Sequence, residues 1–484
     1  MHAAYCMQAR NHGCHSDSRQ IARLSGCLNA VARVAVWRTA CMPKLCNGPL
    51  PLPCTAYCAL PIAFTVYTQE TSLKSTRYIL LTGFLSLIAF TAQARQWVAS
   101  WQASPQPVWA QDFAFPTGIP QAIQDATFTQ NVMISRGGKR LRLVISNRYG
   151  TAPLVVEQTT VSRKTGNAGL TDAPKTATFS GRAVVTIAPG QQVISDPLDM
   201  PVADLQQLQI AHYVKAKMAL ETFHWDGRQQ AMFRKGNQTQ SPMSVADQVL
   251  HRTQARVFLT RIDTESESPA CTAAVLGDSI TDGNGVPIDS NTRVTDYMAD
   301  TLRSAGIGVI NAGISGARLL GDKMGEHAMA RISHDVFDAP GVTTLVLFIG
   351  INDISWPGTA FAPTQSMPAL SSLQAGYRKL AAFAKSRGLR VIGVTLAPFR
   401  GALAGTPLDN YYDDRKNHLR LAVNAWIRDA GVFDAVVDAD RLLQDRHDAT
   451  KLDARYDSGD HLHPGPAGNA VLAQAIAGQI SSCQ

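Results

Sequence analysis

Short apolar runs alternate with helical patterns over the C-terminal part of the chain. The runs lie at 272–276, 309–312, 344–349, 391–396 and 434–439. Between two of these runs, apolar side chains recur at spacings of three and four, as on one face of a helix: Leu373, Tyr377, Leu380 and Phe383. The alternation predicts βαβ units and a five-stranded, mainly parallel sheet that helices cover on both faces.

The chain before this region has a strand pattern instead. In residues 95–268, apolar and polar positions alternate with a period of two in runs such as TFTQNVMISRGG and KRLRLVISNRYG. The pattern predicts an antiparallel β-sandwich of jelly-roll type, with its tryptophans as core anchors: Trp97, Trp101 and Trp109. The polar stretch 262–270 is expected to be a linker, and residues 269–484 the second domain.

Residues 73–94 have the three parts of a secretory signal peptide. Lys74 and Arg77 precede an uncharged apolar stretch, and an A-x-A cleavage site ends at Ala94. A membrane anchor is the alternative, but the apolar stretch of about 13 residues is shorter than the roughly 20 that a spanning helix needs. We therefore expect a secreted or periplasmic protein without a stable membrane span in the mature chain.

The 72 residues before this signal show neither a helical nor a strand period. We interpret residues 1–72 as a disordered upstream extension, with translation starting near Leu73. The alternative is a small cysteine-rich metal or disulfide module, because seven of the nine cysteines lie in the first 58 residues. Cys271 and Cys483 are the other two, and in an oxidising compartment they are candidates for one disulfide.

The net charge of +8 does not point to a nucleic-acid partner, because it is concentrated in the leader. Residues 1–94 hold eight Lys and Arg against two Asp and Glu, whereas the rest of the chain holds 37 against 35. A phosphate-binding surface would need basic residues in the body of the protein. Neither a metal-binding motif nor a nucleotide-binding loop is present in that body, so we expect no cofactor and no metal.

Small polar clusters follow the predicted strands, at the edge of the sheet where ligands bind in such folds. They are GDSIT (277–281), NAGISG (311–316), GIND (350–353) and DSGDHLHP (457–464). Ser279 is a candidate nucleophile in the first cluster. In the last, His463 is a candidate base, because Asp460 three residues earlier can accept its Nδ1–H. His461 is the rival base, and Pro464 is expected to start the last helix.

The four clusters, in this order, resemble the four blocks of the SGNH (GDSL-type) hydrolase superfamily over roughly residues 272–480. Ile280 stands where the eponymous motif has Leu, a change that leaves the catalytic residues intact. The stretch NAGISGARLL…GINDISWPG and the opening WVASWQASPQ further resemble secreted arylesterases and polysaccharide side-chain esterases with an N-terminal β-rich domain. The resemblance implies a three-layer α/β/α, flavodoxin-like catalytic domain.

The resemblance also implies the groups that stabilise an oxyanion. They are the backbone N–H groups of Ser279 and Gly316 and the side-chain amide of Asn352, with Gly313 as the alternative to Gly316. Trp356 is expected to be either a wall of the substrate pocket or a buried loop anchor. Asp353 is expected to hydrogen-bond within its own loop, and Asp278 to hold the turn around Ser279.

These observations together predict a secreted serine esterase that acts through an acyl-enzyme on small-molecule or polysaccharide esters. Acetyl, other short-acyl or aryl esters are the expected substrates. A lipase or lysophospholipase of the same superfamily is the second enzymatic interpretation. A carbohydrate-binding protein with an inactive hydrolase domain is the third, although Ser279, Asp460 and His463 are all present.

Overall fold

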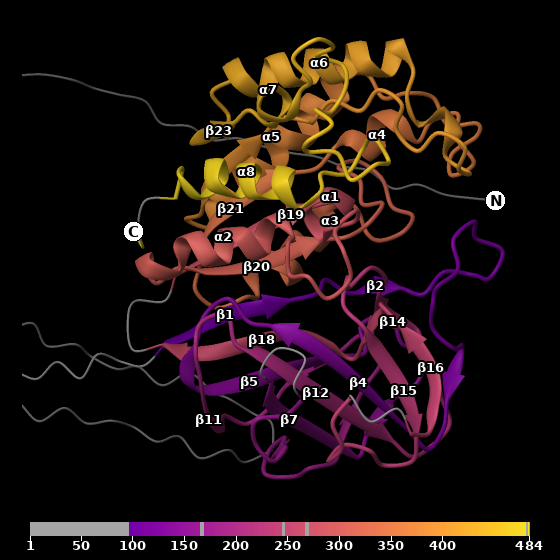
Figure 1. Ribbon diagram of the computed structural model, residues 1–484, viewed down its shortest axis with the longest axis vertical. Coiled ribbons are helices and arrows are strands. Elements are labelled where there is room, and N and C mark those ends of the chain that lie inside the picture. The colour runs from indigo at the N-terminus through magenta and orange to yellow at the C-terminus, as the bar shows by residue number, and fades with distance from the viewer. Residues whose placement is uncertain (1–95, 165–168, 244–246, 267–270, 481–482, 484) are drawn as a thin grey trace, which may run out of the picture. The chain divides into compact units, whose positions relative to one another are not determined.

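Two antiparallel sheets pack together in the first described part of the chain (Figure 1). The computed structural model describes residues 96–483 except 165–168, 244–246, 267–270 and 481–482. One sheet has the order β1-β18-β5-β10, with β11 also paired to β5, and the other has the order β16-β15-β4-β12-β7-β8. Side chains such as Leu143, Leu208 and Ile262 are fully buried between them. The predicted antiparallel β-sandwich is thus confirmed, and we call residues 96–266 the sandwich.

The strands of the first sheet are β1 (Gln96–Gln102), β5 (Gly138–Ser146), β10 (Gln192–Ile194), β11 (Leu198–Val202) and β18 (Leu259–Ser266). Those of the second are β4 (Ala126–Met133), β7 (Gln158–Lys164), β8 (Lys175–Ala177), β12 (Gln207–Val214), β15 (Ala231–Lys235) and β16 (Val249–Thr253). Smaller sheets are formed by β2 (Gln106–Pro107), β14 (Thr222–His224) and β17 (Arg256–Val257), by β3 (Ala122–Ile123) and β13 (Met218–Ala219), and by β6 (Leu154–Val156) and β9 (Val185–Ile187).

The predicted linker at 262–270 is wrong for its described residues. Residues 262–266 belong to β18, which is hydrogen-bonded on both sides, to β1 and to β5. Its polarity has a different cause, because the Asp263 carboxylate is fully buried between two guanidinium groups. They belong to Arg142, at 2.9 Å, and Arg261, at 2.7 Å. The sequence of this segment is polar and therefore predicts a linker. Its buried carboxylate is neutralised by arginines, so the segment forms an interior strand of the sheet.

The second part of the chain, residues 271–483, is built on a parallel sheet of order β20-β19-β21-β22-β23. Its strands are β19 (Thr272–Gly277), β20 (Gly308–Gly313), β21 (Val342–Phe348), β22 (Arg390–Val394) and β23 (Ala435–Val437). All five overlap the predicted runs. β22 and β23 each end two residues before their runs do, and after β23 Asp438 caps the helix that follows. We call these residues the α/β part.

Helices cover both faces of this sheet, as predicted (Figure 1). One face carries α2 (Val294–Leu302), α7 (Ala439–Leu443) and α8 (Pro466–Ala477), and the other carries α3 (Ala328–Ile332), α5 (Leu370–Ser386) and α6 (Asp414–Asp429). The remaining helical segments are α1 (Ser279–Asp282), α4 (Ile351–Ser355), η1 (Arg303–Ala305), η2 (Ser333–Phe337) and η3 (Asp409–Tyr411). The three-layer α/β/α architecture is confirmed.

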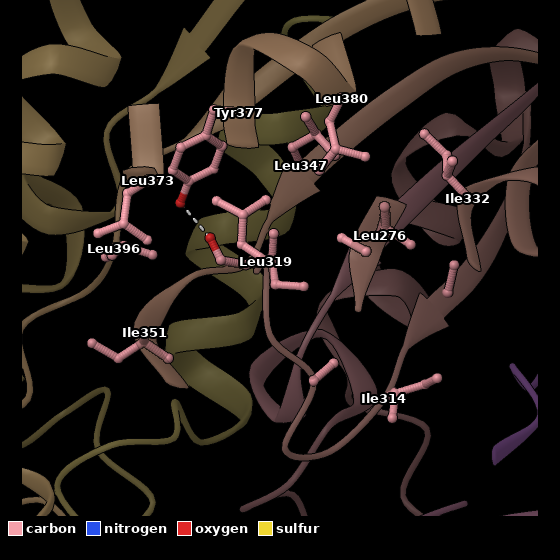
Figure 2. Close-up of a cluster of buried hydrophobic side chains, with 14 of the residues drawn as sticks. Leu276, Ile314, Leu319, Ile332, Leu347, Ile351, Leu373, Tyr377, Leu380 and Leu396 are labelled. Atoms are coloured by element: carbon pink, nitrogen blue, oxygen red, sulfur yellow. Dashed lines mark hydrogen bonds between the residues drawn. The ribbon is translucent and has the colours of Figure 1, made fainter. Parts of the chain in front are cut away.

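The predicted apolar face of α5 packs against the sheet (Figure 2). Leu373, Tyr377 and Leu380 are each about 1% exposed, and the Tyr377 hydroxyl donates a hydrogen bond to the carbonyl of Ile349. This bond lies at the end of β21, directly before α4. The helix therefore supports the strand end that carries the third polar cluster.

One expectation about the last helix is wrong. Pro464 precedes α8, which starts at Pro466 with Gly465 as its N-cap. Pro464 instead forms a bridge to Asp457 that closes the loop of the fourth cluster. Two prolines two residues apart both satisfy the preference for a helix start, and the chain uses the second.

The sandwich is hydrogen-bonded to the α/β part along β1 and β20. The Ala99 N–H donates to Pro340 O at 2.8 Å, and the Ala99 carbonyl accepts from the Thr272 hydroxyl at 3.0 Å. The Val309 N–H of β20 donates to the Ser135 hydroxyl at 2.9 Å. The predicted boundaries at 268 and 269 stay predictions, and the predicted signal peptide and the extension before it lie outside the described residues.

A fully buried guanidinium holds the carboxyl ends of β19 and β20 together. Arg331 donates to the carbonyl of Gly277 at 2.8 Å and to that of Ala312 at 2.6 Å, and pairs with Asp335 at 2.8 Å. We expect Arg331→Leu to lower the free energy of unfolding by about 3 kcal/mol or more, because it leaves a buried carboxylate and two carbonyls without this partner. Urea denaturation measures the change.

The matched control is Arg441→Ala, which removes an ion pair to Asp438 from a side chain that is 71% exposed. The control is expected to cost about 0–1 kcal/mol. Equal effects of the two substitutions would contradict the role given to Arg331.

Candidate active site

Ser279 lies where β19 turns sharply into α1. Asp278 is the N-cap, and its carboxylate accepts the Ile280 N–H at 3.1 Å. Gly277 makes the turn possible, because a Cβ there would lie 2.0 Å from the Thr281 hydroxyl oxygen. Ser279 is 7% exposed, and as the first helical residue it has an N–H without a partner inside the helix.

The imidazole of His463 bridges Ser279 and Asp460. The Ser279 Oγ lies 2.8 Å from Nε2, and an Asp460 carboxylate oxygen lies 2.6 Å from Nδ1. Burial alone would raise the pKa of Asp460. The hydrogen bond and charge of His463, together with the backbone N–H groups of His463 and Leu462, instead hold that pKa well below its usual value. An ionised Asp460 fixes the Nδ1–H tautomer and leaves Nε2 to face Ser279.

His461, the alternative candidate for the base, does not face Ser279. His461 is exposed, and its Nδ1 contacts Asp457 at 2.5 Å rather than any residue of the first three clusters. The structure thus brings Ser279, His463 and Asp460 together and leaves His461 outside.

The two glycine alternatives for an oxyanion donor differ in what their N–H groups do. The Gly313 N–H donates to the side chain of Asn311 at 2.8 Å and is therefore occupied. The Gly316 N–H has no hydrogen-bond partner within the described residues. Gly316 has a φ of 79°, and a Cβ there would lie 2.3 Å from the Met324 sulfur, so the position needs glycine.

Asn352 lies on α4 with its amide orientation fixed from both ends. Its Nδ2 donates to the Ala317 carbonyl at 2.9 Å, and its Oδ1 accepts from the Tyr411 hydroxyl at 2.7 Å. Burial keeps the pKa of Tyr411 well above its usual value, so the phenol remains a donor. One amide N–H of Asn352 is left for a ligand. Sequence reasoning missed Tyr411, because nothing in its local pattern links it to residue 352.

The expected role of Asp353 is wrong. Its carboxylate accepts the N–H groups of Leu319 and Leu320, at 2.7 and 2.8 Å, and so ties α4 to the loop of the second cluster rather than to its own loop. Burial raises the pKa of Asp353 to about 6, against these N–H bonds, which lower it. Asp278 holds the turn around Ser279, as expected.

A cavity of about 120 Å³ opens onto Ser279, His463, Gly316 and Asn352. We call it the serine cavity. Its walls are mostly apolar and include Phe115 and Trp225 of the sandwich beside Met324, Trp356, Phe361 and Leu462. Trp356 is both a wall and a buried anchor, since it is 1% exposed and packs edge-on against Phe361. Sequence reasoning missed both sandwich residues, which reach the site only through the packing of the two parts.

The three tryptophans that were expected to anchor the sandwich core lie in different surroundings. Trp101 is buried between the sheets, and Trp97 lies beneath the Arg142 guanidinium at 4.5 Å. Trp109 is half-buried and packs against Phe113, Phe223 and Trp225, so it supports the aromatic wall of the serine cavity.

The predicted disulfide is absent from the structure. Cys271 and Cys483 are both free thiols, and they are neighbours in hydrogen-bonding contact rather than a bonded pair. Burial and the contact with Cys271 raise the pKa of Cys483 to about 12.

Two further findings concern the described residues alone. None of their helices combines the length and the apolar character needed to cross a membrane. Among them, no group of three or more His, Cys, Asp and Glu side chains could hold a metal ion.

A family model matches the part of the chain that contains the site. The model of the GDSL-like lipase/acylhydrolase family matches residues 275–471, which include all four polar clusters and confirm the resemblance inferred from them. No curated protein matches the chain.

Several solved structures resemble part of the chain. A GDSL-like lipase from Bacteroides thetaiotaomicron is 18% identical, covers 43% of this chain and 87% of its own, and has a TM-score of 0.33. The acetyl xylan esterase AlAXEase is 19% identical over 43% of this chain and 100% of its own, with a TM-score of 0.32. A mutant of Axe2, an acetyl-xylooligosaccharide esterase from Geobacillus, is 21% identical. The match covers 44% of this chain and 95% of that protein, with a TM-score of 0.31.

The buried Asp278 gives a prediction about stability and pH. Burial raises its pKa to about 7, against an ordinary value of 3.8. Between these values the folded protein binds a proton that the unfolded chain has released, so this residue lowers the free energy of unfolding as the pH rises from about 4 to about 7. Asp278→Asn keeps an acceptor for the helix cap and does not titrate.

We expect the stability of Asp278→Asn relative to the unchanged protein to increase across this pH interval and to level off above about pH 8. Urea denaturation at a series of pH values measures the difference. A difference that does not vary with pH would show that Asp278 titrates normally.

Proposed function

We propose that this protein, whose residues 275–471 match the model of the GDSL-like lipase/acylhydrolase family, is an exported serine esterase that cleaves short-acyl or aryl esters, such as the acetyl side chains of plant polysaccharides. The observation that supports the chemistry most strongly is the chain of hydrogen bonds from Asp460 through His463 to Ser279. Export is proposed from the signal-peptide pattern at 73–94.

In the proposed reaction, the Ser279 Oγ attacks the ester carbonyl while His463 Nε2 takes the hydroxyl proton. The protonated imidazole is stabilised by Asp460 and then gives this proton to the alcohol oxygen as the carbon–oxygen bond breaks. An acyl-Ser279 remains. Water, deprotonated by His463, attacks the acyl carbonyl, releases the acid and restores the Ser279 hydroxyl.

The carbonyl oxygen becomes negatively charged in both steps. The Ser279 and Gly316 N–H groups and the Asn352 amide are the donors proposed for it. Three features support this assignment: all three residues line the serine cavity, the Gly316 N–H has no partner among the described residues, and Tyr411 holds the Asn352 amide with its nitrogen available.

The size of the serine cavity favours a short acyl group. A volume of about 120 Å³ with apolar walls suits an acetyl or small aryl group better than a long fatty chain. A lipase or lysophospholipase would need an extended apolar groove. A non-catalytic carbohydrate-binding role would not require Ser279 at hydrogen-bond distance from His463.

A second cavity supports a hydroxyl-rich alcohol. This open groove of about 430 Å³ shares Trp225 and Asn284 with the serine cavity and continues over the sandwich. Its lining is mixed and includes Asp226, His251, Arg252 and Thr253 beside Pro116 and Trp225. An alcohol that leaves the serine cavity would enter this groove, and a sugar chain, which presents both hydroxyl groups and apolar ring faces, suits this mixed lining.

The first test compares the protein with its Ser279→Ala variant. We expect fast hydrolysis of p-nitrophenyl acetate and release of acetate from acetylated xylan, with at least a 1,000-fold loss of kcat in the variant (about 4 kcal/mol), because the nucleophile is gone. p-Nitrophenyl octanoate and palmitate are the controls for chain length. A preference for palmitate would move the proposal to a lipase, and equal, negligible rates in both proteins would overturn the esterase.

A second test concerns the groove. Trp225→Ala is expected to lower kcat/KM on acetylated xylan about tenfold, since an aromatic contact contributes on the order of 1 kcal/mol. The effect on p-nitrophenyl acetate should be smaller, because that substrate does not extend over the sandwich. Trp225→Phe keeps an aromatic ring against Phe115 and is the matched control. Equal losses on both substrates would show that Trp225 shapes only the serine cavity.

A further inference from the structure

A histidine of the sandwich reaches the helix that begins with Ser279. His224 lies at the end of β14, outside the residues that match the family, and is 6% exposed. Its Nε2 is 2.9 Å from an Asp282 carboxylate oxygen, and its Nδ1 is 3.0 Å from the Ser104 carbonyl oxygen. Asp282 is the last residue of α1, which Ser279 opens.

An imidazolium suits both neighbours of the His224 ring. The Ser104 carbonyl oxygen can only accept a hydrogen bond, and a carboxylate at Asp282 accepts at both oxygens, one facing His224 and the other taking the N–H and O–H of Ser315. We therefore take both ring nitrogens of His224 as protonated. Burial lowers its pKa, but the charge and hydrogen bond of Asp282 outweigh burial and raise that pKa above its usual value. The other charged groups facing the ring are Arg256 and Asp226.

The second oxygen of Asp282 holds the loop of the second cluster. It accepts the backbone N–H and the hydroxyl of Ser315, both at 2.8 Å. Ser315 directly precedes Gly316, whose N–H is a proposed oxyanion donor. One buried carboxylate thus joins the sandwich, the nucleophile helix and the residue next to that donor.

We propose that His224 is a positioning residue of the oxyanion site, acting through Asp282 and Ser315. The proposal rests on the proposed esterase function, because it assigns Gly316 a role in that reaction. Without the imidazolium, the buried Asp282 would lose the opposite charge to which it is hydrogen-bonded, and it would protonate or turn toward water. Either change loosens Ser315 and, with it, Gly316. An oxyanion donor acts only when it is held in place before the charge develops.

The arrangement also gives the sandwich a part in catalysis that does not depend on substrate contact. The side chain that donates to the outer oxygen of Asp282 comes from β14 and not from the α/β part. The α/β part alone would therefore keep Ser279, His463 and Asp460 but lose this hydrogen bond to Asp282.

The test compares His224→Ala and His224→Gln in the full-length protein with p-nitrophenyl acetate as the substrate. A misplaced donor weakens transition-state binding more than substrate binding, so kcat should fall roughly 100-fold in His224→Ala with KM changed less than about threefold. The Gln side chain can still donate a hydrogen bond to Asp282. The kcat of His224→Gln should therefore be about tenfold higher than that of His224→Ala.

Two further variants separate this effect from a loosened interface. Gln102 also links the two parts, donating to the Asp335 carbonyl at 2.7 Å, but it does not line the serine cavity. Gln102→Ala should leave kcat within about twofold. Ser315→Ala combined with His224→Ala should lose less than the product of the two single losses, because both act through Asp282. A fall in kcat no greater than that of Gln102→Ala, or a change in KM alone, would overturn the proposal.

An NMR measurement tests the positioning role of His224 without relying on ester hydrolysis. Heteronuclear spectra of the histidine rings should show both nitrogens of His224 protonated at pH 7, and His224→Gln should shift the Ser315 and Gly316 amide signals. A neutral His224, or unshifted amides, would overturn the positioning role even with an active enzyme. If the spectra are as expected but the protein hydrolyses no ester, the proposed function is overturned. His224 would then order the loop of the second cluster without serving catalysis.

Discussion

The hydrogen bond between Ser279 and His463 joins two residues that lie 184 positions apart, and most of the architecture serves to make it possible. Ser279 follows the carboxyl end of β19, while His463 lies in the loop before α8. The parallel register brings the strand ends together, since Gly277 lies opposite Gly313 of β20 and opposite Phe348 of β21. The proposed oxyanion donors of the second and third clusters therefore emerge beside Ser279.

Buried carboxylates hold this edge of the sheet, and their surroundings decide how each behaves. Asp460 faces an imidazole and two backbone N–H groups and stays ionised. Asp278 is fully buried with one N–H bond, and burial raises its pKa to about 7. Asp282 is held between the sandwich and the loop of the second cluster. Asp278 and Asp460 each hold the turn in which they lie, whereas Asp282 joins α1 to the loop of the second cluster and to the sandwich.

The residues that the structure brings together at the serine cavity could be predicted from sequence because each lies in a short local motif. Four short clusters, each at the end of an apolar run, contain Ser279, Gly316, Asn352 and the pair Asp460 and His463. The spacing to Asp460 favours His463 over His461 as the base. In the structure, His463 is hydrogen-bonded to Ser279. The parallel sheet and the sandwich were predictable for the same reason, since periodicity reports burial within one element.

What could not be predicted depends on contacts between distant segments. Tyr411 orients Asn352, Trp225 walls the serine cavity, and His224 contacts Asp282, yet none of these residues lies in a motif. The polar pattern at 262–266 predicts a linker, whereas these residues form a strand because Asp263 pairs with Arg142 and Arg261 within the sandwich. A sequence pattern cannot reveal a partner that only the fold supplies.

The central claim is that Ser279 becomes acylated during the reaction. The most direct measurement quenches the protein with acid during turnover of p-nitrophenyl acetate and locates the acetyl group by mass spectrometry of its peptides. We expect an acetyl group on Ser279 that disappears once the substrate is consumed. Ester hydrolysis without modification of Ser279, or with an acyl group that accumulates at another residue at the rate of turnover, would contradict it.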